Sequence, residues 1–291
     1  MSSADTTALP LAGQMAFITG GGSGIGLACA AQFLRDGASV LLFGRDANKL
    51  ELARSQLRSQ LQSQSASAHA ADVYVHAGDV SIESDVIAAV AAATAVHGTL
   101  NIAVANAGTG ALAPVIATTD EHWQRVMQTN LNGTFYTFKH AGAAIARSGG
   151  GAMCAISSIA GVRTHRFMGA YCASKAAIDM LARNTADELG VANVRVNSVC
   201  PGLVDTDLSA GLRDTDAIRA DYLECMPISR VGTVSDVANA VRFLCGPESS
   251  WVTGVTLSVD GGHHLRRGPN IDALAAMLFP KEVREGIVAV G

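Results

Sequence analysis

Charged residues are scarce in this sequence, and neither sign dominates. Only 16% of the 291 residues are Asp, Glu, Lys or Arg, the formal net charge is −4, and the isoelectric point is near 6.0. Such a balance provides no overall attraction to the phosphate backbone of nucleic acids or to anionic lipid. We therefore do not expect a nucleic acid among the partners of this protein.

The sequence also lacks a long uninterrupted apolar run and a secretory leader. Residues 86–119 contain no charged side chain, but His97, Gly98, Asn101 and Asn106 divide them into runs shorter than the ~18 to 20 residues of a membrane span. The N-terminal segment is polar and lacks the basic-then-apolar order of a secretory signal. The sequence therefore predicts a cytoplasmic protein with no membrane partner.

Cysteines are few and widely spaced, and no cluster of metal-binding histidines accompanies them. Because no C-x-x-C pair occurs, neither a disulfide framework nor a zinc site is predicted. We expect no metal. We expect buried, free thiols at the six positions, which are Cys29, Cys154, Cys172, Cys200, Cys225 and Cys245.

Apolar side chains, in contrast, are abundant. Hydrophobic residues make up 49% of the chain and the mean hydropathy is +0.27, which is more apolar material than a small soluble monomer usually needs. We expect part of it to lie in the subunit interfaces of a homo-oligomer. The length of 291 residues suits one large α/β domain better than two independent ones.

Short apolar runs alternate along the chain with longer segments of helical periodicity. The runs predict strands at 15–19, 38–43, 72–75, 100–104, 152–157, 194–199 and 255–259. The longer segments predict helices near 25–36, 46–63, 83–96, 120–146, 170–189 and 235–245. This β-α-β alternation is typical of a Rossmann-like, doubly wound parallel sheet with helices on both faces.

A glycine-rich segment follows the first predicted strand and opens the first predicted helix. Glycines allow a tight turn, a close approach of the backbone to a pyrophosphate, and close packing of helix against strand. Leu27 stands where a P-loop would need its lysine, which excludes an NTPase loop. The alternative is a turn without a ligand. We favour a dinucleotide site with contacts at Gly20, Ser23, Gly24, Ile25 and Gly26.

Tyr171 and Lys175 are four residues apart in a predicted helix, so the phenol and the ammonium lie on one face. A free tyrosine has a pKa of about 10, and a nearby cation favours its phenolate form. Lys175 can supply that charge and make Tyr171 a proton donor or acceptor near neutrality. Alone the pair is weak support, because such pairs also occur on solvated helices.

Polar residues at the ends of two predicted strands strengthen the interpretation. Ser157-Ser158 ends one strand, and Asn106-Ala107-Gly108 ends another. Ligands of open parallel sheets bind outside the carboxyl ends of the strands. We therefore expect these residues to surround one crevice together with Tyr171 and Lys175.

On these motifs the sequence resembles the short-chain dehydrogenase/reductase family from Leu11 to about Gly262. The resemblance implies an NAD(P)(H)-dependent oxidoreductase that transfers a hydride reversibly between nicotinamide and a ketone or secondary alcohol, such as a 3-oxoacyl, steroid or small-ketone substrate. It also implies a dimer or tetramer. We accordingly divide the chain into a flexible N-terminus (1–10), a dinucleotide-binding catalytic domain (11–262) and a C-terminal extension with a short helix (263–291).

The resemblance also assigns roles to individual residues. Ser158 would hold the substrate oxygen, Tyr171 would transfer the proton, and Lys175 would bind the nicotinamide ribose while tuning Tyr171. Asn130 would join a proton-relay water. An amide is unfavourable in a helix interior unless something there needs it, which agrees with such a role. Further cofactor contacts are implied at Asp79 and Val80 beside the adenine and at Asn106, Ala107, Gly108, Pro201, Gly202, Val204 and Thr206.

The end of the second strand bears on the choice of cofactor. Gly44 occupies the position where the family places an acidic residue, and Arg45 follows. A guanidinium suits a 2′-phosphate through a charge-assisted contact, so we predict NADP over NAD. Ser23, however, stands where many NADP-using relatives have a second basic residue. Asp46 could also turn toward the ribose, which keeps NAD as the alternative.

Substrate recognition is expected from a flap at 203–227. Its apolar candidates for lining the pocket are Leu203, Leu208, Leu212 and Met226. Two basic groups could flank the cleft and would suit a phosphate-bearing acyl thioester, although ordinary surface or interface charges are the alternative. They are Arg163, His165 and Arg166, and His263, His264, Arg266 and Arg267.

The C-terminal segment predicts a docked helix. Ile271, Leu274, Ala275 and Leu278 occur at helical spacing, and Asn270 is a candidate cap. This helix would cover either its own active site or a neighbouring subunit.

Two other functions fit the same scaffold. One is reduction of the C=C bond of an enoyl thioester, and the other is a cofactor-binding sensor without catalysis. The presence of Ser158, Tyr171 and Lys175 favours carbonyl chemistry over both.

Overall fold

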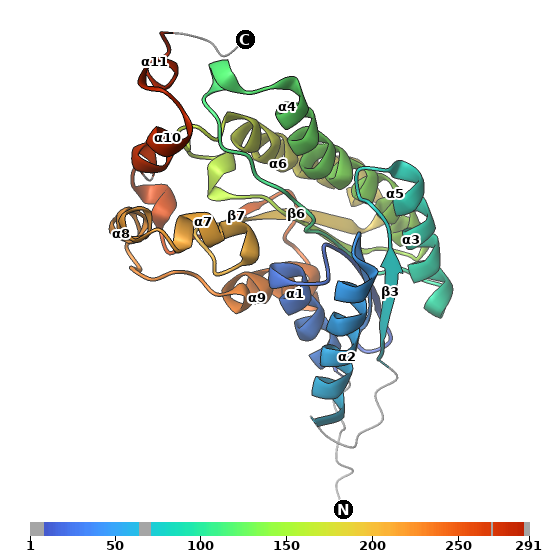
Figure 1. The fold of residues 1–291 in the computed structure, drawn as a ribbon. Coiled ribbons are helices and arrows are strands. Elements are labelled where there is room, and N and C mark those ends of the chain that lie inside the picture. The colour runs from blue at the N-terminus through green and yellow to red at the C-terminus, as the bar shows by residue number, and fades with distance from the viewer. Residues whose placement is uncertain (1–8, 64–70, 269, 288–291) are drawn as a thin grey trace, which may run out of the picture.

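Seven parallel strands form one central sheet in the computed structural model, which describes residues 9–63, 71–268 and 270–287 (Figure 1). Their spatial order is β3-β2-β1-β4-β5-β6-β7. The doubly wound parallel architecture predicted from the sequence is therefore confirmed. The strands are β1 (Met15–Thr19), β2 (Ser39–Gly44), β3 (Val73–Ala77), β4 (Ile102–Ala105), β5 (Gly151–Ile156), β6 (Val194–Pro201) and β7 (Thr256–Val259).

Helices cover both faces of this sheet. One face is covered by α1 (Gly24–Arg35), α2 (Ala47–Ser63) and α9 (Val234–Cys245). The other is covered by α3 (Glu83–His97), α5 (Gly133–Arg147) and α6 (Gly169–Leu189). Every residue of β1 is buried between the two layers, which explains why the inner strands are continuous apolar runs in the sequence.

The order of the strands reverses between β1 and β4, which lie side by side. The chain leaves β1 toward β2 on one side, and it leaves β4 toward β5 on the other. At such a point the two connections diverge and a crevice opens outside the carboxyl ends of the strands. The glycine turn after β1 and the Asn106 turn after β4 therefore border the same crevice.

The segment expected as one helix from 120 to 146 is not uniform. After α4 (Asp120–Val126), a π-helical segment spans Met127–Asn132 before α5 begins. An amphipathic period does not distinguish one π turn from α-helix, so the sequence could not reveal it. The π turn carries Asn130, whose side chain is fully buried, and single π turns of this kind are frequent at functional sites.

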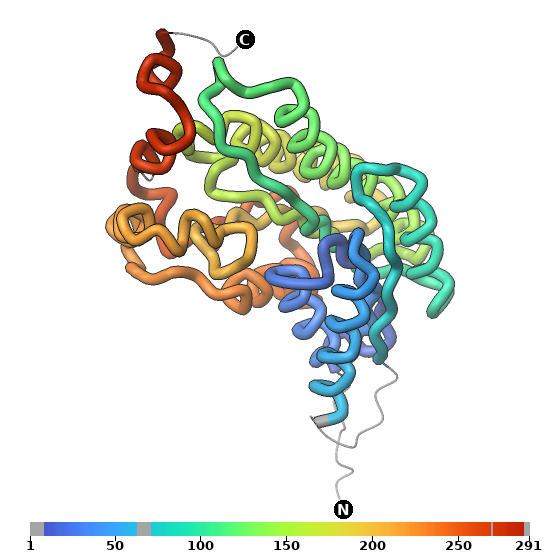
Figure 2. The backbone as a smooth tube through the Cα atoms, in the orientation of Figure 1, coloured from blue at the N-terminus to red at the C-terminus, as the bar shows by residue number. Residues whose placement is uncertain are grey.

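The flap and the C-terminal tail form short helices beyond the carboxyl ends of the strands, and Figures 1 and 2 show them close together. The sequence predicted the tail helix, but it gave no bounds for helices in the flap. The flap contains a 3-10 turn (Asp207–Ser209), α7 (Ala210–Arg213) and α8 (Asp216–Cys225), and the tail contains α10 (Asp272–Leu278) and α11 (Lys281–Arg284).

The tail docks on the flap of its own chain. Ile271 and Ala275 are buried in one small core with Ile218 and Tyr222 of α8. Leu278, which we expected on the same docked face, is 56% exposed because only the first turn of this short helix packs against α8. The last residues of the 263–291 extension and most of segment 1–10 lie outside the described residues.

Across the described part of the chain, no helix combines the length and the apolar character that crossing a membrane would require. The described cysteines are all free thiols, and only Cys172 is not fully buried.

Candidate active site

The turn between β1 and α1 needs glycine at two positions. Gly20 has φ +64°, and a Cβ at Gly26 would lie 2.5 Å from the Gly20 carbonyl oxygen. The helix begins behind this turn, and the Ser23 side chain does not cap it. The first N–H groups of α1 are therefore left available to an anion, as a pyrophosphate site requires.

Asn106 connects the end of β4 to this turn through hydrogen bonds. Its Nδ2 donates hydrogen bonds to the carbonyl oxygens of Thr19 (3.0 Å) and Gly20 (3.1 Å). The Thr19 hydroxyl in turn accepts from the backbone N–H groups of Asn106 (3.0 Å) and Ala107 (3.1 Å). Because the Asn106 amide is engaged in this way, its contribution to the crevice is to fix the shape of the backbone.

One cleft of about 630 Å³ runs along the carboxyl ends of the strands, from the glycine turn to the flap. Gly26 and Asn130 do not line it but lie behind its wall. All other residues predicted for the site line the cleft. They are Gly20, Ser23, Gly24, Ile25, Arg45, Asp79, Val80, Asn106, Ala107, Gly108, Ser158, Tyr171, Lys175, Pro201, Gly202, Val204 and Thr206.

Ser158 and Tyr171 meet in the middle of the cleft. Ser158 follows β5, and its Oγ accepts a hydrogen bond from the Ala160 N–H (3.1 Å), which leaves its own proton free to be donated. Burial raises the pKa of Tyr171, and the nearby Ser158 hydroxyl only partly opposes this effect. The tuning of Tyr171 by Lys175 stays a prediction.

Lys175 lies one turn further along α6. Its Nζ is 5.6 Å from the centroid of the Tyr171 ring and donates a hydrogen bond to the Ile156 carbonyl (2.7 Å). The ammonium is itself desolvated, since burial lowers the pKa of Lys175 to about 8, although the charge of Asp179 opposes the shift. A lysine with this pKa can change its charge within a unit or two of neutrality.

Asp179 was not predicted from the sequence, although it follows Lys175 by the same spacing as Lys175 follows Tyr171. It is 4% exposed, and burial raises its pKa. Its Oδ1 accepts from the Ser198 hydroxyl (2.8 Å), while Oδ2 lies 3.7 Å from the Cys200 thiol. Asp179 thus supplies a fixed negative charge behind the Lys175 side chain.

Asn130 binds the loop after β4 to α6. Its Oδ1 accepts from the Thr109 N–H (2.7 Å), and its Nδ2 donates to the Thr109 carbonyl (2.9 Å) and to the Ser174 hydroxyl (3.0 Å). The side chain is fully used in these contacts, so the π turn that carries Asn130 fixes the position of both elements. The proton-relay role of Asn130 remains a prediction.

The end of the cleft next to β2 contains two cations. Arg45 is exposed and has no ion pair among the described residues. Lys49, which was not predicted from the sequence, lines the cleft one turn further along and lies 3.4 Å from Asp207 of the flap. Asp46 also lines the cleft, and its Oδ1 accepts from the Lys49 N–H (3.0 Å), which leaves Oδ2 for other contacts.

Asp79 lies at the same end. Its Oδ1 accepts hydrogen bonds from the backbone N–H (2.9 Å) and the hydroxyl (2.8 Å) of Ser81. One carboxylate oxygen therefore shapes the turn after β3, which leaves Oδ2 for other contacts.

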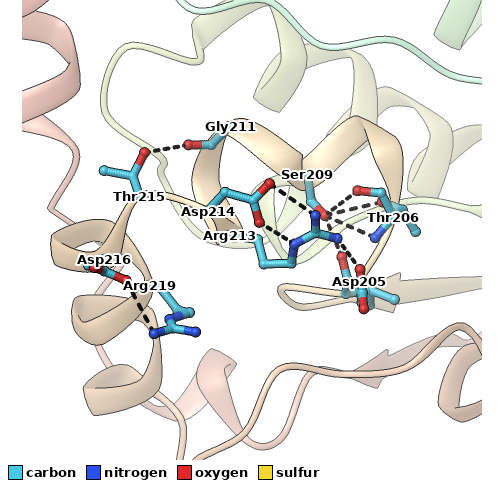
Figure 3. A network of polar contacts seen from close by, with 10 residues as sticks. Asp205, Thr206, Ser209, Gly211, Arg213, Asp214, Thr215, Asp216 and Arg219 are labelled. Atoms are coloured by element: carbon cyan, nitrogen blue, oxygen red, sulfur yellow. Dashed lines mark hydrogen bonds and ion pairs between the residues drawn. The ribbon is translucent and has the colours of Figure 1, made fainter.

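The flap runs along the cleft from Asp207, beside Lys49, to Tyr222. Of its apolar candidates, Leu203, Leu208 and Leu212 line the cleft, whereas Met226 is 2% exposed in the core beneath the flap and does not. Figure 3 shows how Arg213 joins Asp205 and Asp214 within the flap. The Asp205 and Asp214 side chains are exposed, so these acidic residues belong to a solvated surface.

The two basic groups hold the tail and flap together. Arg163 donates to the His264 carbonyl (2.8 Å), Arg166 pairs with Asp272, and Arg267 pairs with Asp221 (2.7 Å). Arg266 donates to a carbonyl of α8, at Glu224 (2.6 Å). Since these guanidinium groups already have partners and only His165 of the two groups lines the cleft, they do not form an anion site for an acyl thioester.

Comparison with known proteins agrees with this geometry. The family model described as enoyl-(acyl carrier protein) reductase matches residues 20–264. Galactitol 2-dehydrogenase (L-tagatose-forming) of Cereibacter sphaeroides is 35% identical over 88% of this chain and 97% of the relative. 2-(S)-Hydroxypropyl-CoM dehydrogenase 3 of Xanthobacter autotrophicus is 37% identical over 84% and 94%. A short-chain type dehydrogenase/reductase from Mycobacterium ulcerans superposes with a TM-score of 0.91 at 40% identity, covering 96% of this chain and all of that one.

The chain therefore belongs to the short-chain dehydrogenase/reductase family, as its motifs suggested. It is an NAD(P)-dependent oxidoreductase that transfers a hydride between nicotinamide and a ketone or secondary alcohol.

Proposed function

We propose that Tyr171, Ser158 and Lys175 carry out reversible reduction of a ketone at the centre of the cleft. The observation that carries this proposal is the meeting of two hydroxyl donors, Ser158 and Tyr171, in a cleft that also reaches the glycine turn. Bound NAD(P)H supplies the hydride. Ser158 donates a hydrogen bond to the substrate oxygen and orients it, while Tyr171 gives that oxygen the proton that completes the alcohol.

Lys175 holds a positive charge beside Tyr171 and stabilises the phenolate that remains after proton transfer. Because its own pKa is about 8, Lys175 can return a proton toward Tyr171 near neutrality. Asp179, buried behind it, keeps this pKa from falling further. In the direction of alcohol oxidation the same groups act in reverse order.

We infer that NADP is preferred to NAD. The uncapped N-terminus of α1 and the glycine turn would hold the pyrophosphate. Arg45, which has no ion pair among the described residues, together with Lys49, would bind the 2′-phosphate of the adenine ribose. Gly44 offers no carboxylate to a free 2′-hydroxyl, and one of the two carboxylate oxygens of Asp46 is engaged with the Lys49 N–H.

Carbonyl reduction is favoured over reduction of an enoyl thioester. Two hydroxyl donors in one cleft suit an oxygen that becomes an alcohol. The arginines considered for a phosphate-bearing acyl thioester are paired with residues of the tail and flap. A sensor without catalysis would have no need for the desolvated Lys175 beside Tyr171.

A panel of ketones and enoyl thioesters with NADPH and NADH, followed at the nicotinamide absorbance, tests this proposal. We expect oxidation of NADPH with ketones, slower oxidation of NADH, and no reaction with enoyl thioesters. If only enoyl thioesters are turned over, the proposal of carbonyl reduction is wrong and C=C reduction is the function. If no substrate is turned over, the result supports a sensor without catalysis.

We further propose a homo-oligomer, a dimer or tetramer. Large apolar side chains are exposed near the β7 edge of the sheet, among them Phe243 (42%), Trp251 (98%) and Val255 (38%), and such a group suits a subunit interface. Light scattering should give a multiple of the 29.9 kDa chain mass, and a mass of one chain would contradict the proposal. The cytoplasmic location stays a prediction.

A further inference from the structure

Two polar side chains at the flap end of the cleft have no role in the proton transfer described above. His165 is 6% exposed and Tyr222 is 3% exposed, and both line the cleft that contains Tyr171. His165 comes from the loop between Ser158 and α6, and Tyr222 comes from α8 of the flap. Their ring centroids are 6.2 Å apart, so two distant segments place them in one wall.

Each of these side chains keeps one hydrogen-bonding atom free. His165 Nδ1 lies 3.2 Å from the Arg163 carbonyl oxygen, which assigns the hydrogen to Nδ1 and leaves a lone pair on Nε2. Within the described part of the chain, neither His165 Nε2 nor the Tyr222 hydroxyl has a hydrogen-bond partner. Neither atom is sealed from solvent, since both residues line the cleft. Two free polar atoms on one wall of a cleft are available to a polar group of a ligand.

The charge state of this pair limits which ligands suit it. Burial lowers the pKa of His165 and raises that of Tyr222, so both side chains are neutral near pH 7. Tyr171 raises the pKa of Tyr222 further, which agrees with the two phenols sharing the cleft. A neutral acceptor beside a neutral donor gives little to a carboxylate or phosphate, but it matches a hydroxyl, which donates one hydrogen bond and accepts another.

The surroundings fix both rings. Phe167 adopts the left-handed conformation (φ +67°) that a non-glycine residue keeps only where its neighbours hold it, and its carbonyl accepts from the Ala113 N–H (2.8 Å). This holds the loop that carries His165. Behind the pair, the His263 ring lies edge-on to the Tyr222 ring, with 5.5 Å between the ring centroids. The centroid of the His263 ring is 6.1 Å from that of His165.

The His263 ring behind the pair is held by one hydrogen bond. Its side chain is fully buried, and its Nε2 lies 3.0 Å from the Arg267 carbonyl oxygen, which assigns the hydrogen to Nε2. Its Nδ1 has no hydrogen-bond partner among the described residues. The hydrogen bond to Arg267 fixes the ring against which His165 and Tyr222 pack.

We propose that His165 and Tyr222 form a subsite for a hydroxyl group close to the reacting carbonyl, which makes a hydroxyketone, or the corresponding diol, the preferred class of substrate. The substrate hydroxyl donates to His165 Nε2 and accepts from the Tyr222 hydroxyl, while the neighbouring carbonyl contacts Ser158 and Tyr171. This inference rests on the proposed function, since it requires Tyr171 to act on a carbonyl.

Matched pairs of ketones in which a methyl group replaces the hydroxyl test the subsite. The pairs are 1-hydroxybutan-2-one with pentan-3-one and 4-hydroxybutan-2-one with pentan-2-one, each measured with NADPH and NADH. We expect the wild type to prefer the hydroxyketone of at least one pair by about tenfold or more in kcat/KM, because the methyl analogue leaves two polar groups unpaired.

Three variants and one control locate the preference. His165→Leu and Tyr222→Phe should each lower kcat/KM for the hydroxyketone about tenfold while leaving the methyl analogue within about threefold. His165→Gln, whose amide reaches the position of Nε2, should restore part of the preference. His264→Gln serves as the control, since His264 pairs with Asp260 and does not line the cleft, and it should keep the full preference.

The outcomes separate this inference from the proposed function. If the methyl analogues are reduced but the wild type shows no preference, or if the variants lose both members of a pair equally, the subsite is wrong while carbonyl reduction stands. Activity on the methyl analogues also shows that the variants are folded. If the wild type reduces no ketone of either pair with either cofactor, the proposed function fails and the inference fails with it.

Discussion

Replacing Lys175 by Met should stabilise the cofactor-free protein near neutral pH while it removes activity. The Lys175 side chain is 4% exposed, and burial lowers its pKa from the ordinary value of 10.5 to about 8, even though Asp179 opposes the shift. This lowering of the pKa means that the protonated form of Lys175 costs the folded protein about 3 kcal/mol relative to the unfolded chain. An uncharged side chain of similar shape avoids that penalty.

The sign and the pH window follow from the two pKa values. Between about pH 8 and about pH 10.5 the unfolded chain holds a proton that the folded chain lacks, so the stability of the wild type rises with pH through this window. Below about pH 8 the penalty is fully present. Methionine leaves the Ile156 carbonyl without its donor, which costs about 1 kcal/mol. The net gain is about 2 kcal/mol at pH 7, and it vanishes near pH 10.

Urea denaturation at pH 7 and pH 10, followed by far-ultraviolet circular dichroism, measures this difference. Lys139→Met is the matched control, because Lys139 is an exposed lysine paired with Glu83 at 2.8 Å, and its effect should be small and similar at both pH values. A Lys175→Met protein that is less stable than the wild type at pH 7, by an amount that does not change at pH 10, would refute the reasoning.

Four other changes have defined outcomes. Gly26→Ala places a Cβ 2.5 Å from the Gly20 carbonyl and should weaken cofactor binding about tenfold or more by fluorescence titration, with unchanged affinity as the contrary result. Arg45→Ser should raise the Kd for NADPH about 10- to 100-fold and leave NADH within about threefold, whereas equal losses would argue against 2′-phosphate binding. Truncation after Gly268 removes the tail that packs on the flap, so it should raise KM but spare cofactor binding; an unchanged KM would make the tail irrelevant to the cleft. Asn130→Ala should lower the unfolding free energy by about 1–3 kcal/mol in urea denaturation, because buried partners lose their hydrogen bonds, and a change below about 0.5 kcal/mol would contradict this.

The sheet and the centre of the site could be predicted because their signals are local. The strand 15–19 begins and ends at the residues observed for β1, since a strand buried on both faces is a continuous apolar run. Tyr171 and Lys175 lie on one helix, so their spacing alone places them together. Parallel topology then brings the ends of β4 and β5 to the same crevice.

The residues that were missed depend on contacts between distant segments. Tyr222 reaches the cleft only because α8 folds over it under the docked tail. Lys49 lies near Asp207 through the placement of the flap, and no local pattern marks it. The basic groups were predicted as possible anion sites because the sequence does not reveal that Arg166 and Arg267 have acidic partners in the tail and the flap.

The most direct test of the account is the Tyr171→Phe variant, which removes only the phenolic oxygen from the centre of the cleft. We expect turnover of every active ketone to fall by about 10²-fold or more, while the Kd for NADPH stays within about threefold of the wild type. That result would separate proton transfer from cofactor binding. A variant that retained the rate of the wild type would contradict the assignment of Tyr171 as the proton donor.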